Sequence, residues 1–174
     1  GTKMFISYRQ DFDDAFPHAS QYSLSEPYNI STRTYDGDAA RCNLTDVSER
    51  VTDLAFSHDG YKMFVSFGGL NGGADDDIVY GYELSSPYNI STCSYSDNKT
   101  TDLDGKLNGS LAGDDIAPAD KVRLQGLDFN NNGTKMFLLF LGDGTDVNKD
   151  TRKERLLEFN LSTPYDLTDI TLVE

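Results

Sequence analysis

The chain has 174 residues, with 29 acidic against 15 basic side chains and a formal net charge of −14. This charge disfavours nucleic acid as a partner, because a protein that binds phosphates needs a basic face to displace their counterions. It equally disfavours an anionic membrane surface, and no run of about twenty apolar residues suggests insertion into a bilayer. We therefore expect an acidic, self-repelling surface, with some Asp residues as candidate cation ligands.

Two phrases recur three times along the chain. The first reads GTKMFI at 1–6, GYKMFV at 60–65 and GTKMFL at 133–138; the second follows each copy, at 22–31, 82–91 and 159–168, as in YELSSPYNIS. Self-similarity at this scale indicates a repeat architecture. We divide the single domain, residues 1–174, into units at 1–46, 47–118 and 119–174, with a polar excursion at 97–120.

The predicted elements are strands and turns, without helical periodicity of any length. Unit 1 begins at its second strand, so its opening strand would precede Gly1. Unit 2 has an alternating strand at 51–57, a His-Asp-Gly turn, and strands at 62–67, 78–84 and 90–95. Unit 3 has the corresponding strands at 122–129, 135–141, 155–161 and 167–173, with an Asn-rich turn at 130–133. Asp-Gly and Asn-Gly turns between apolar runs are strong hairpin signals.

The strands differ in polarity in a regular way. The nearly continuous apolar runs at 62–67 and 135–141 are typical of strands buried on both faces, whereas the fourth strands are more polar. That gradient suits a propeller blade, whose outermost strand faces water. The two phrases together resemble the tandem β-propeller repeats of secreted and surface proteins. This resemblance covers nearly the whole chain and implies an all-β, propeller-like fold of three consecutive four-stranded antiparallel units, the first lacking its opening strand.

The number of units has a consequence for assembly. Three blades are too few to close a ring, which normally needs at least about four. An open row of sheets leaves an unpaired edge at each end. We therefore expect covalent continuation with further repeats, or self-association in which another copy covers the edges.

Seven of the eleven Asn residues begin an Asn-x-Ser/Thr triplet, the acceptor for N-linked glycans. They are Asn29, Asn43, Asn89, Asn98, Asn108, Asn132 and Asn160. This density predicts a glycoprotein from a secretory pathway, and hence a secreted or cell-surface location. The alternative is that polar turns use Asn, Ser and Thr for their bonds to nearby backbone. Asn132 is the weakest candidate, because a sugar fits poorly in a tight hairpin turn.

The two cysteines, Cys42 and Cys93, lie in corresponding regions of consecutive units. They are too few for a disulfide scaffold. A bridge between neighbouring units is one reading, and two separate half-buried thiols are the other.

A candidate calcium loop lies at 143–150. Asp146, Asn148 and Asp150 place oxygen ligands at alternate positions, as many calcium loops do. Arg152 and Lys153 follow directly and would repel a cation. A solvated acidic loop is therefore the alternative, and no other cofactor is predicted.

Catalysis has little support in the sequence. His18 and His58 are the two histidines, and no metalloprotease, nucleophile-elbow or phosphate-loop motif occurs. Carboxylates are too numerous for a glycosidase pair to be distinguished from surface charge without geometry. We predict that the chain is not an enzyme. A hydrolase fragment is the last of three hypotheses about function, and the two that we favour over it are given next.

The leading hypothesis is an extracellular structural or adhesive glycoprotein, a subunit of a fibre, sheath or surface appendage. The second is a lectin-like propeller module that binds glycans or proteins through the loops between its strands. Tyr28, Tyr88 and Tyr165 follow the repeated proline. They either pack beneath the turn and fix the corner of each unit, or stack on sugars or a neighbouring subunit.

Overall fold

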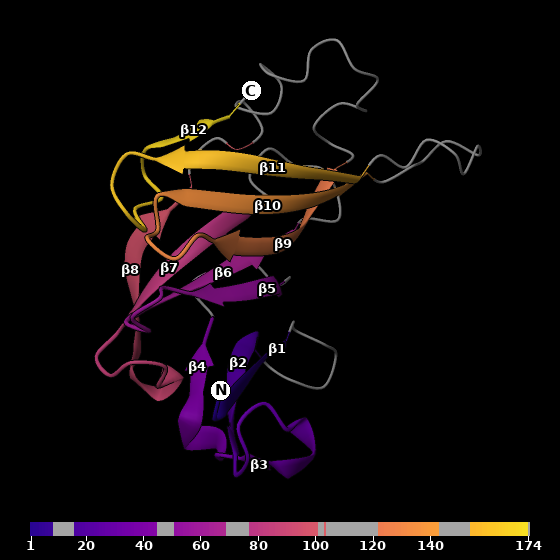
Figure 1. The fold of residues 1–174 in the computed structure, drawn as a ribbon, viewed down its shortest axis with the longest axis vertical. Coiled ribbons are helices and arrows are strands. Elements are labelled where there is room, and N and C mark those ends of the chain that lie inside the picture. The colour runs from indigo at the N-terminus through magenta and orange to yellow at the C-terminus, as the bar shows by residue number, and fades with distance from the viewer. Residues whose placement is uncertain are drawn as a thin grey trace, which may run out of the picture.

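The computed structural model describes residues 1–8, 16–44, 51–68, 77–100, 103, 122–142 and 154–173. It confirms the all-β prediction, with three antiparallel four-stranded sheets, one in each repeat unit. The sheets follow one another through the molecule, from the N-terminal sheet at the bottom of Figure 1 to the C-terminal sheet at the top. No described helix is long and apolar enough to cross a membrane.

The sheet of unit 1 has an interrupted outer strand. β1 (Lys3–Tyr8) pairs with β2 (His18–Leu24), and β2 pairs on its other edge with both β3 (Arg33–Tyr35) and β4 (Arg41–Asn43). The sequence predicts three strands for this unit, and the structure has four. A 3-10 turn at Asp38–Ala40 divides the outer strand into β3 and β4.

Units 2 and 3 are four-stranded meanders with the same strand order. Unit 2 runs β5 (Val51–Phe56), β6 (Lys62–Phe67), β7 (Ile78–Leu84), β8 (Cys93–Lys99), and unit 3 runs β9 (Val122–Phe129), β10 (Lys135–Gly142), β11 (Glu154–Leu161), β12 (Ile170–Leu172). The first three strands of each unit agree with the predicted segments to within about a residue. Tight turns join β5 to β6 and β9 to β10, with Gly60 and Gly133 at positive φ of 75° and 69°.

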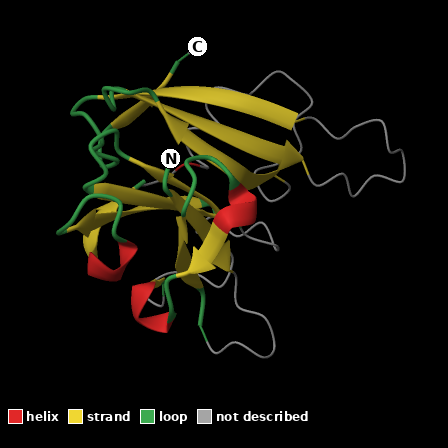
Figure 2. Cartoon of the chain, turned by 60° about the horizontal axis from the view of Figure 1, so that its bottom comes forward, coloured by secondary structure: helices red, strands yellow, loops and turns green. Residues whose placement is uncertain are grey.

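The fourth strands begin later than the sequence predicts. A 3-10 turn occupies Ile90–Thr92, so β8 starts at Cys93 instead of residue 90. β8 also continues to Lys99, which pairs with Tyr80, so the first three residues assigned to the excursion at 97–120 belong to the sheet. β12 is likewise confined to Ile170–Leu172. Figure 2 shows the 3-10 turns as short helices among the strands.

Each sheet has two faces, which we name by the repeated Met-Phe pair. The rear face carries Met63 or its equivalent, and the front face carries Phe64 or its equivalent, because successive strand residues point to opposite sides. In unit 2 both residues are fully buried. Met63 belongs to the core shared with unit 1, and Phe64 belongs to the core shared with unit 3. The middle sheet is therefore covered on both faces by its neighbours.

The opening strands of units 2 and 3, β5 and β9, lie side by side. β9 also contacts β6, and β5 contacts β1, the strand of unit 1 that corresponds to β6. Within the described residues, β1 has no strand on the edge where β6 has β5 and β10 has β9. The unit 1 sheet thus lacks the opening strand of the other two, as the sequence predicts.

Candidate functional site: the junctions between units

The two repeated phrases of unit 2 fold against each other. Tyr88 adopts the left-handed region, with φ of 53°, which costs a residue with a side chain about 1–2 kcal/mol. Its N–H donates to the Gly60 carbonyl at 2.8 Å, and its ring lies over Gly60 so closely that a Cβ there would sit 2.4 Å from ring carbon Cδ2. The hydroxyl of Tyr88 donates to the His58 carbonyl at 2.7 Å. The ring thus fixes the corner of the unit, and Gly60 is required for its approach.

The other two units repeat this arrangement. Tyr28 and Tyr165 have φ of 62° and 59°, and each donates its N–H to Gly1 or Gly133 at 2.8 Å. Tyr165 also reaches across to the preceding unit, because its hydroxyl accepts the His58 N–H at 3.0 Å. Of the two readings of these tyrosines, packing at the corner is the one that the structure shows for Tyr88 and Tyr165.

Aromatic side chains join one unit to the next in the same way at both junctions. Phe5, on the front face of unit 1, lies 4.5 Å from Phe56 between ring centroids. Phe64, at the same place in unit 2, lies 4.5 Å from Phe129, and its ring also stacks near Tyr165 at 6.0 Å. Tilted aromatic pairs at this distance add about 0.5–1.5 kcal/mol beyond their burial.

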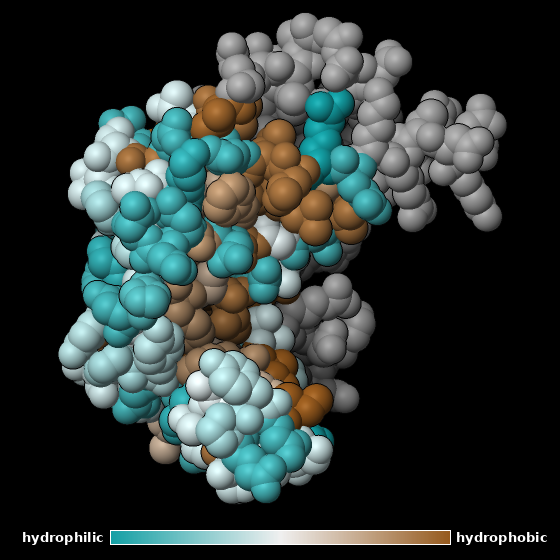
Figure 3. Space-filling view, viewed as in Figure 1, coloured by the Kyte–Doolittle hydropathy of each residue, from teal (hydrophilic) through white to brown (hydrophobic). Residues whose placement is uncertain are grey.

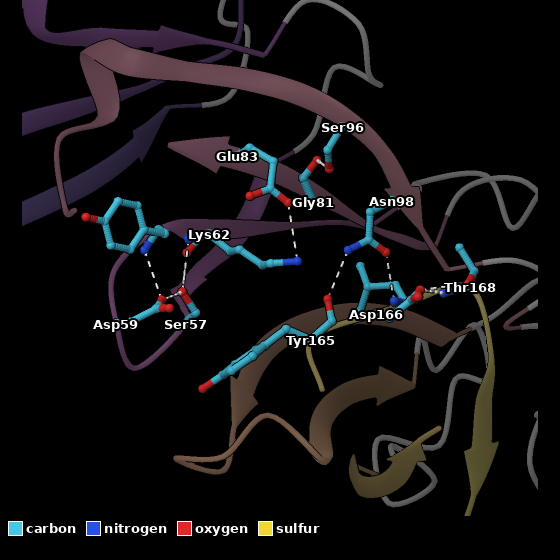
Figure 4. Close-up of polar contacts among 12 residues, drawn as sticks. Ser57, Asp59, Lys62, Gly81, Glu83, Ser96, Asn98, Tyr165, Asp166 and Thr168 are labelled. Atoms are coloured by element: carbon cyan, nitrogen blue, oxygen red, sulfur yellow. Dashed lines mark hydrogen bonds and ion pairs between the residues drawn. The ribbon is translucent and has the colours of Figure 1, made fainter. Parts of the chain in front are cut away.

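A side-chain amide of one unit clamps the 3-10 turn or loop of the next. The Gln21 Oε1 atom accepts the N–H of Ile90 at 3.2 Å. At the second junction the Asn98 Oδ1 atom accepts the N–H of Leu167 at 2.7 Å, and its Nδ2 atom donates to the Tyr165 carbonyl at 3.0 Å (Figure 4). Ile90 and Leu167 occupy the same place in the second repeated phrase. Because Ile90 and Leu167 are buried, losing either clamp would leave an unsatisfied backbone N–H.

Two carboxylates of unit 2 bond to the opening strand of unit 3. Asp53 accepts the Leu127 N–H at 3.0 Å, and Asp77 accepts the Leu124 N–H at 2.9 Å. A Cβ at Gly68 would sit 2.4 Å from the Leu124 carbonyl oxygen. The backbone of unit 3 therefore passes very close to unit 2 here, and charge-assisted hydrogen bonds hold it there.

The Cys42 and Cys93 side chains form a disulfide between units 1 and 2. Cys42 lies on β4 and is fully buried, and Cys93 begins β8. The bridge joins residues 51 apart in sequence. It therefore adds a covalent link to the first junction.

A partly buried polar network stands next to this junction in unit 1. Asp36 accepts hydrogen bonds from Gln21 at 2.7 Å and Lys3 at 2.8 Å. Desolvation by burial opposes ionisation, but the hydrogen bonds from Gln21, Lys3 and Ser23 outweigh it and lower the pKa of Asp36 to about 2. Gln21 is thereby held in the orientation that presents its Oε1 atom to Ile90.

Three of the predicted glycan acceptors have a role in the turns. The Oδ1 atoms of Asn29, Asn89 and Asn132 each accept the backbone N–H and the hydroxyl of the Ser or Thr two residues on, at 2.7–3.3 Å. Asp166 stands at the corresponding place in unit 3 and makes the same two bonds to Thr168, at 3.0 and 2.7 Å (Figure 4). These bonds lower the pKa of Asp166. Since Asp cannot carry an N-linked glycan, the triplet at this position serves the turn.

The remaining triplets divide by exposure. Asn43 on β4 and Asn160 on β11 are exposed. Asn98 is half-buried, and its amide is engaged in the clamp, so a glycan on Nδ2 would compete with the second junction. Asn108 lies outside the described residues.

The acidic loop with Asp146, Asn148 and Asp150 also lies outside the described residues, so the calcium site there stays a prediction. Within the part of the chain that the structure describes, no three His, Cys, Asp or Glu side chains are gathered where they could hold a metal ion.

A cleft of about 690 Å³ opens at the first junction. Phe5, Phe56 and Tyr88 supply aromatic walls, and Gln21 and Asn89 supply side-chain amides. Its volume lies within the range of about 300–1,000 Å³ that is common for small-molecule sites.

Comparison with protein-family models, with curated proteins and with solved structures gave no match. The junctions therefore have to be interpreted from their own geometry. Sequence reasoning did not single out Gln21, and it predicted Asn98 as a glycan acceptor and not as a clamp; both residues lie outside the repeated phrases. The repeated Gly and Tyr were visible as a pattern, although their contact was not.

Proposed function

We propose that the chain is an extracellular structural or adhesive glycoprotein, built of β-propeller-like units and acting as a subunit of a fibre, sheath or surface appendage. The observation that carries this proposal is the repetition of the junction. The residues that recur in the sequence build the corners of the units, as Tyr88 does, and join each unit to its neighbour, as Phe64 and Tyr165 do. The repeated residues of this protein thus form the contacts that join one unit to the next.

The disulfide supports the extracellular location. Such bridges persist in oxidising compartments and are rare in the reducing cytosol. A covalent link between Cys42 and Cys93 would also help a structural subunit to keep its shape outside the cell, where no chaperone refolds it.

The propeller-like arrangement is the architectural part of this proposal. Its support is that the opening strands β5 and β9 lie next to each other, and that the fourth strands are the more solvated. A ring of such units places its opening strands around a central axis. Further units would have to supply the rest of that ring.

We place the proposed glycans first at Asn43 and Asn160, the exposed strand residues. Expression in a secreting eukaryotic host should yield protein whose mass falls on enzymatic removal of N-glycans, and Asn43→Gln and Asn160→Gln should each remove one glycan's mass. Asn89→Asp is the matched control for the turn, because it abolishes a triplet but keeps the Oδ1 acceptor. Its stability should stay within about 0.5 kcal/mol of the wild type.

The mass and shape of the native particle test the proposal as a whole. We expect an assembly larger than one chain, with disulfide-linked units and a mass that drops on deglycosylation. A compact, unmodified monomer in the native source would overturn the structural role and the glycans together.

A lectin-like module is the second candidate, and the cleft at the first junction favours it. Aromatic rings such as Phe56 and Tyr88 can stack on sugar rings, and the side-chain amide of Asn89 can bond to hydroxyls. This candidate predicts a discrete particle that is retained on immobilised glycans and released by free sugar. Retention without any polymer would favour it over the structural role.

A further inference from the structure

The rear face of unit 1 exposes side chains that are buried in the other two units. Ile30 is 64% exposed, whereas Ile90 and Leu167 at the same place are fully buried against the preceding unit. Tyr8 is 36% exposed, and the corresponding Phe67 is fully buried. At these places units 2 and 3 are covered by the preceding unit, whereas no described part of the chain covers unit 1 there.

The front face of unit 3 exposes the residues that form the other half of this contact in units 1 and 2. Leu156 is 69% exposed, whereas Val79 and Ala19, its equivalents in units 2 and 1, are fully buried. Leu139, paired with Leu156 across β10 and β11, is 38% exposed. Figure 3 shows hydrophobic surface where β10 and β11 run. An apolar area of this kind marks an interaction site more often than a surface left in water.

These two faces are the halves of a junction that the molecule already forms twice. At each internal junction the front face of one unit covers the rear face of the next, with Phe5 or Phe64 at its centre. Phe137 is the third member of this series and is half-buried. The chain therefore carries both partners of one contact, one on each end unit.

Charge favours the same match. The rear face of unit 1 carries Arg33, which is exposed, and the front face of unit 3 carries Glu154, which is also exposed. Opposite charges on two faces steer them together and oppose the pairing of like ends. A head-to-tail contact would bring these two charges to one interface, whereas a head-to-head contact would not.

We propose that copies of this chain dock head to tail, the front face of unit 3 of one copy against the rear face of unit 1 of the next. This inference rests on the proposed structural role and names the surfaces that would carry it. A heterologous contact of this kind repeats until it closes a ring or extends as a filament. The two proposed glycans differ in their effect on this contact. Glu83, at the place of Asn160 in unit 2, keeps 51% of its side chain exposed beside a formed junction, so a glycan at Asn160 is compatible with docking. Asn43 pairs with His18, which pairs with Tyr8, on the rear face of unit 1, so a glycan there would compete with docking, and the test uses the unglycosylated chain.

The test uses the mass of the full chain in solution as a function of concentration, measured by sedimentation or light scattering. Two variants each disable one face: Leu156→Arg on the front and Ile30→Arg on the rear. Tyr61→Arg is the control, since this side chain is 46% exposed but belongs to the middle unit. All three substituted side chains are exposed, so we expect unfolding curves close to the wild type.

We expect the wild type and Tyr61→Arg to associate, and each end variant to raise the dissociation constant by at least about tenfold. A mixture of Leu156→Arg and Ile30→Arg should form a heterodimer and stop there, because each variant keeps one working face. That outcome separates head-to-tail docking from any symmetric contact.

Two results would overturn the docking proposal. One is association of the wild type that both end variants leave unchanged, which would move the contact elsewhere and leave the structural role standing. The other is a wild-type chain that stays monomeric at millimolar concentration. In that case the native particle, measured independently, decides whether the structural role falls as well or whether another polypeptide covers these faces.

Discussion

The repeat offers an internal control for the energy of a junction. Phe64 and Phe137 occupy the same place in successive units, but Phe64 is fully buried between units 2 and 3, whereas Phe137 lies half-buried on the front face of unit 3, against which no further described unit packs. Removing a buried Phe ring costs about 3–5 kcal/mol. We expect Phe64→Ala to destabilise the chain by about 4 kcal/mol, because its contacts with Phe129 and Tyr165 are lost as well. Phe137→Ala should cost about 1–2 kcal/mol, in proportion to its burial.

Urea unfolding followed by circular dichroism measures both values, at a dilution where the chain is monomeric. The slope of the unfolding free energy with urea should be the same in both variants, since neither changes the surface exposed on unfolding by much. Equal losses for Phe64→Ala and Phe137→Ala would refute the reasoning, because they would mean that the neighbouring unit contributes nothing to the burial of Phe64.

Three further predictions follow from the same structure. Replacing Cys42 and Cys93 with Ser should lower the unfolding free energy by about 3–4 kcal/mol, since the bridge closes a loop of 51 residues in the unfolded chain; an unchanged stability in non-reducing buffer would contradict the bridge. Gly60→Ala should cost about 2–3 kcal/mol, because Gly60 has positive φ and lies under the Tyr88 ring; a loss below about 1 kcal/mol would contradict that contact. Because the pKa of Asp36 falls from 3.8 to about 2 on folding, its contribution of about 1–2 kcal/mol is present above pH 4 and is lost as the pH falls towards 2; Asp36→Asn should flatten this part of the pH–stability curve, and an unaltered curve would contradict the network.

The first three strands of units 2 and 3 could be predicted from the sequence because their signals are local. β6 alternates between two buried faces, which gives the continuous apolar run at 62–67, and the Gly60 and Gly133 turns separate the strands unambiguously. The fourth strands were less predictable. Ile90–Thr92 has the composition of a strand, but the Asn89 side chain bonds to Ser91 and holds a 3-10 turn instead.

The contacts at the junctions could not be predicted from the sequence, for a different reason. Gln21 and Asn98 act alike, yet they come from β2 and β8, differ in length, and share no motif. Their function depends on how one unit sits on the next, which no local pattern encodes. The Asn-x-Ser/Thr triplets and the alignment of Asp166 with Asn89 were visible in the sequence, but the bonds that these side chains make within the turns needed coordinates.

The bridge between Cys42 and Cys93 has a mechanical consequence for any protein that bears load. A fully extended chain gains about 3.4 Å per residue, so the 51 residues between the two sulfurs represent about 170 Å of length that tension cannot release. If the molecule is pulled from its ends, units 1 and 2 can unfold while the disulfide keeps the chain between these cysteines from extending. Adding a reductant would restore that hidden length, and a single-molecule stretching trace would record it as a longer final extension.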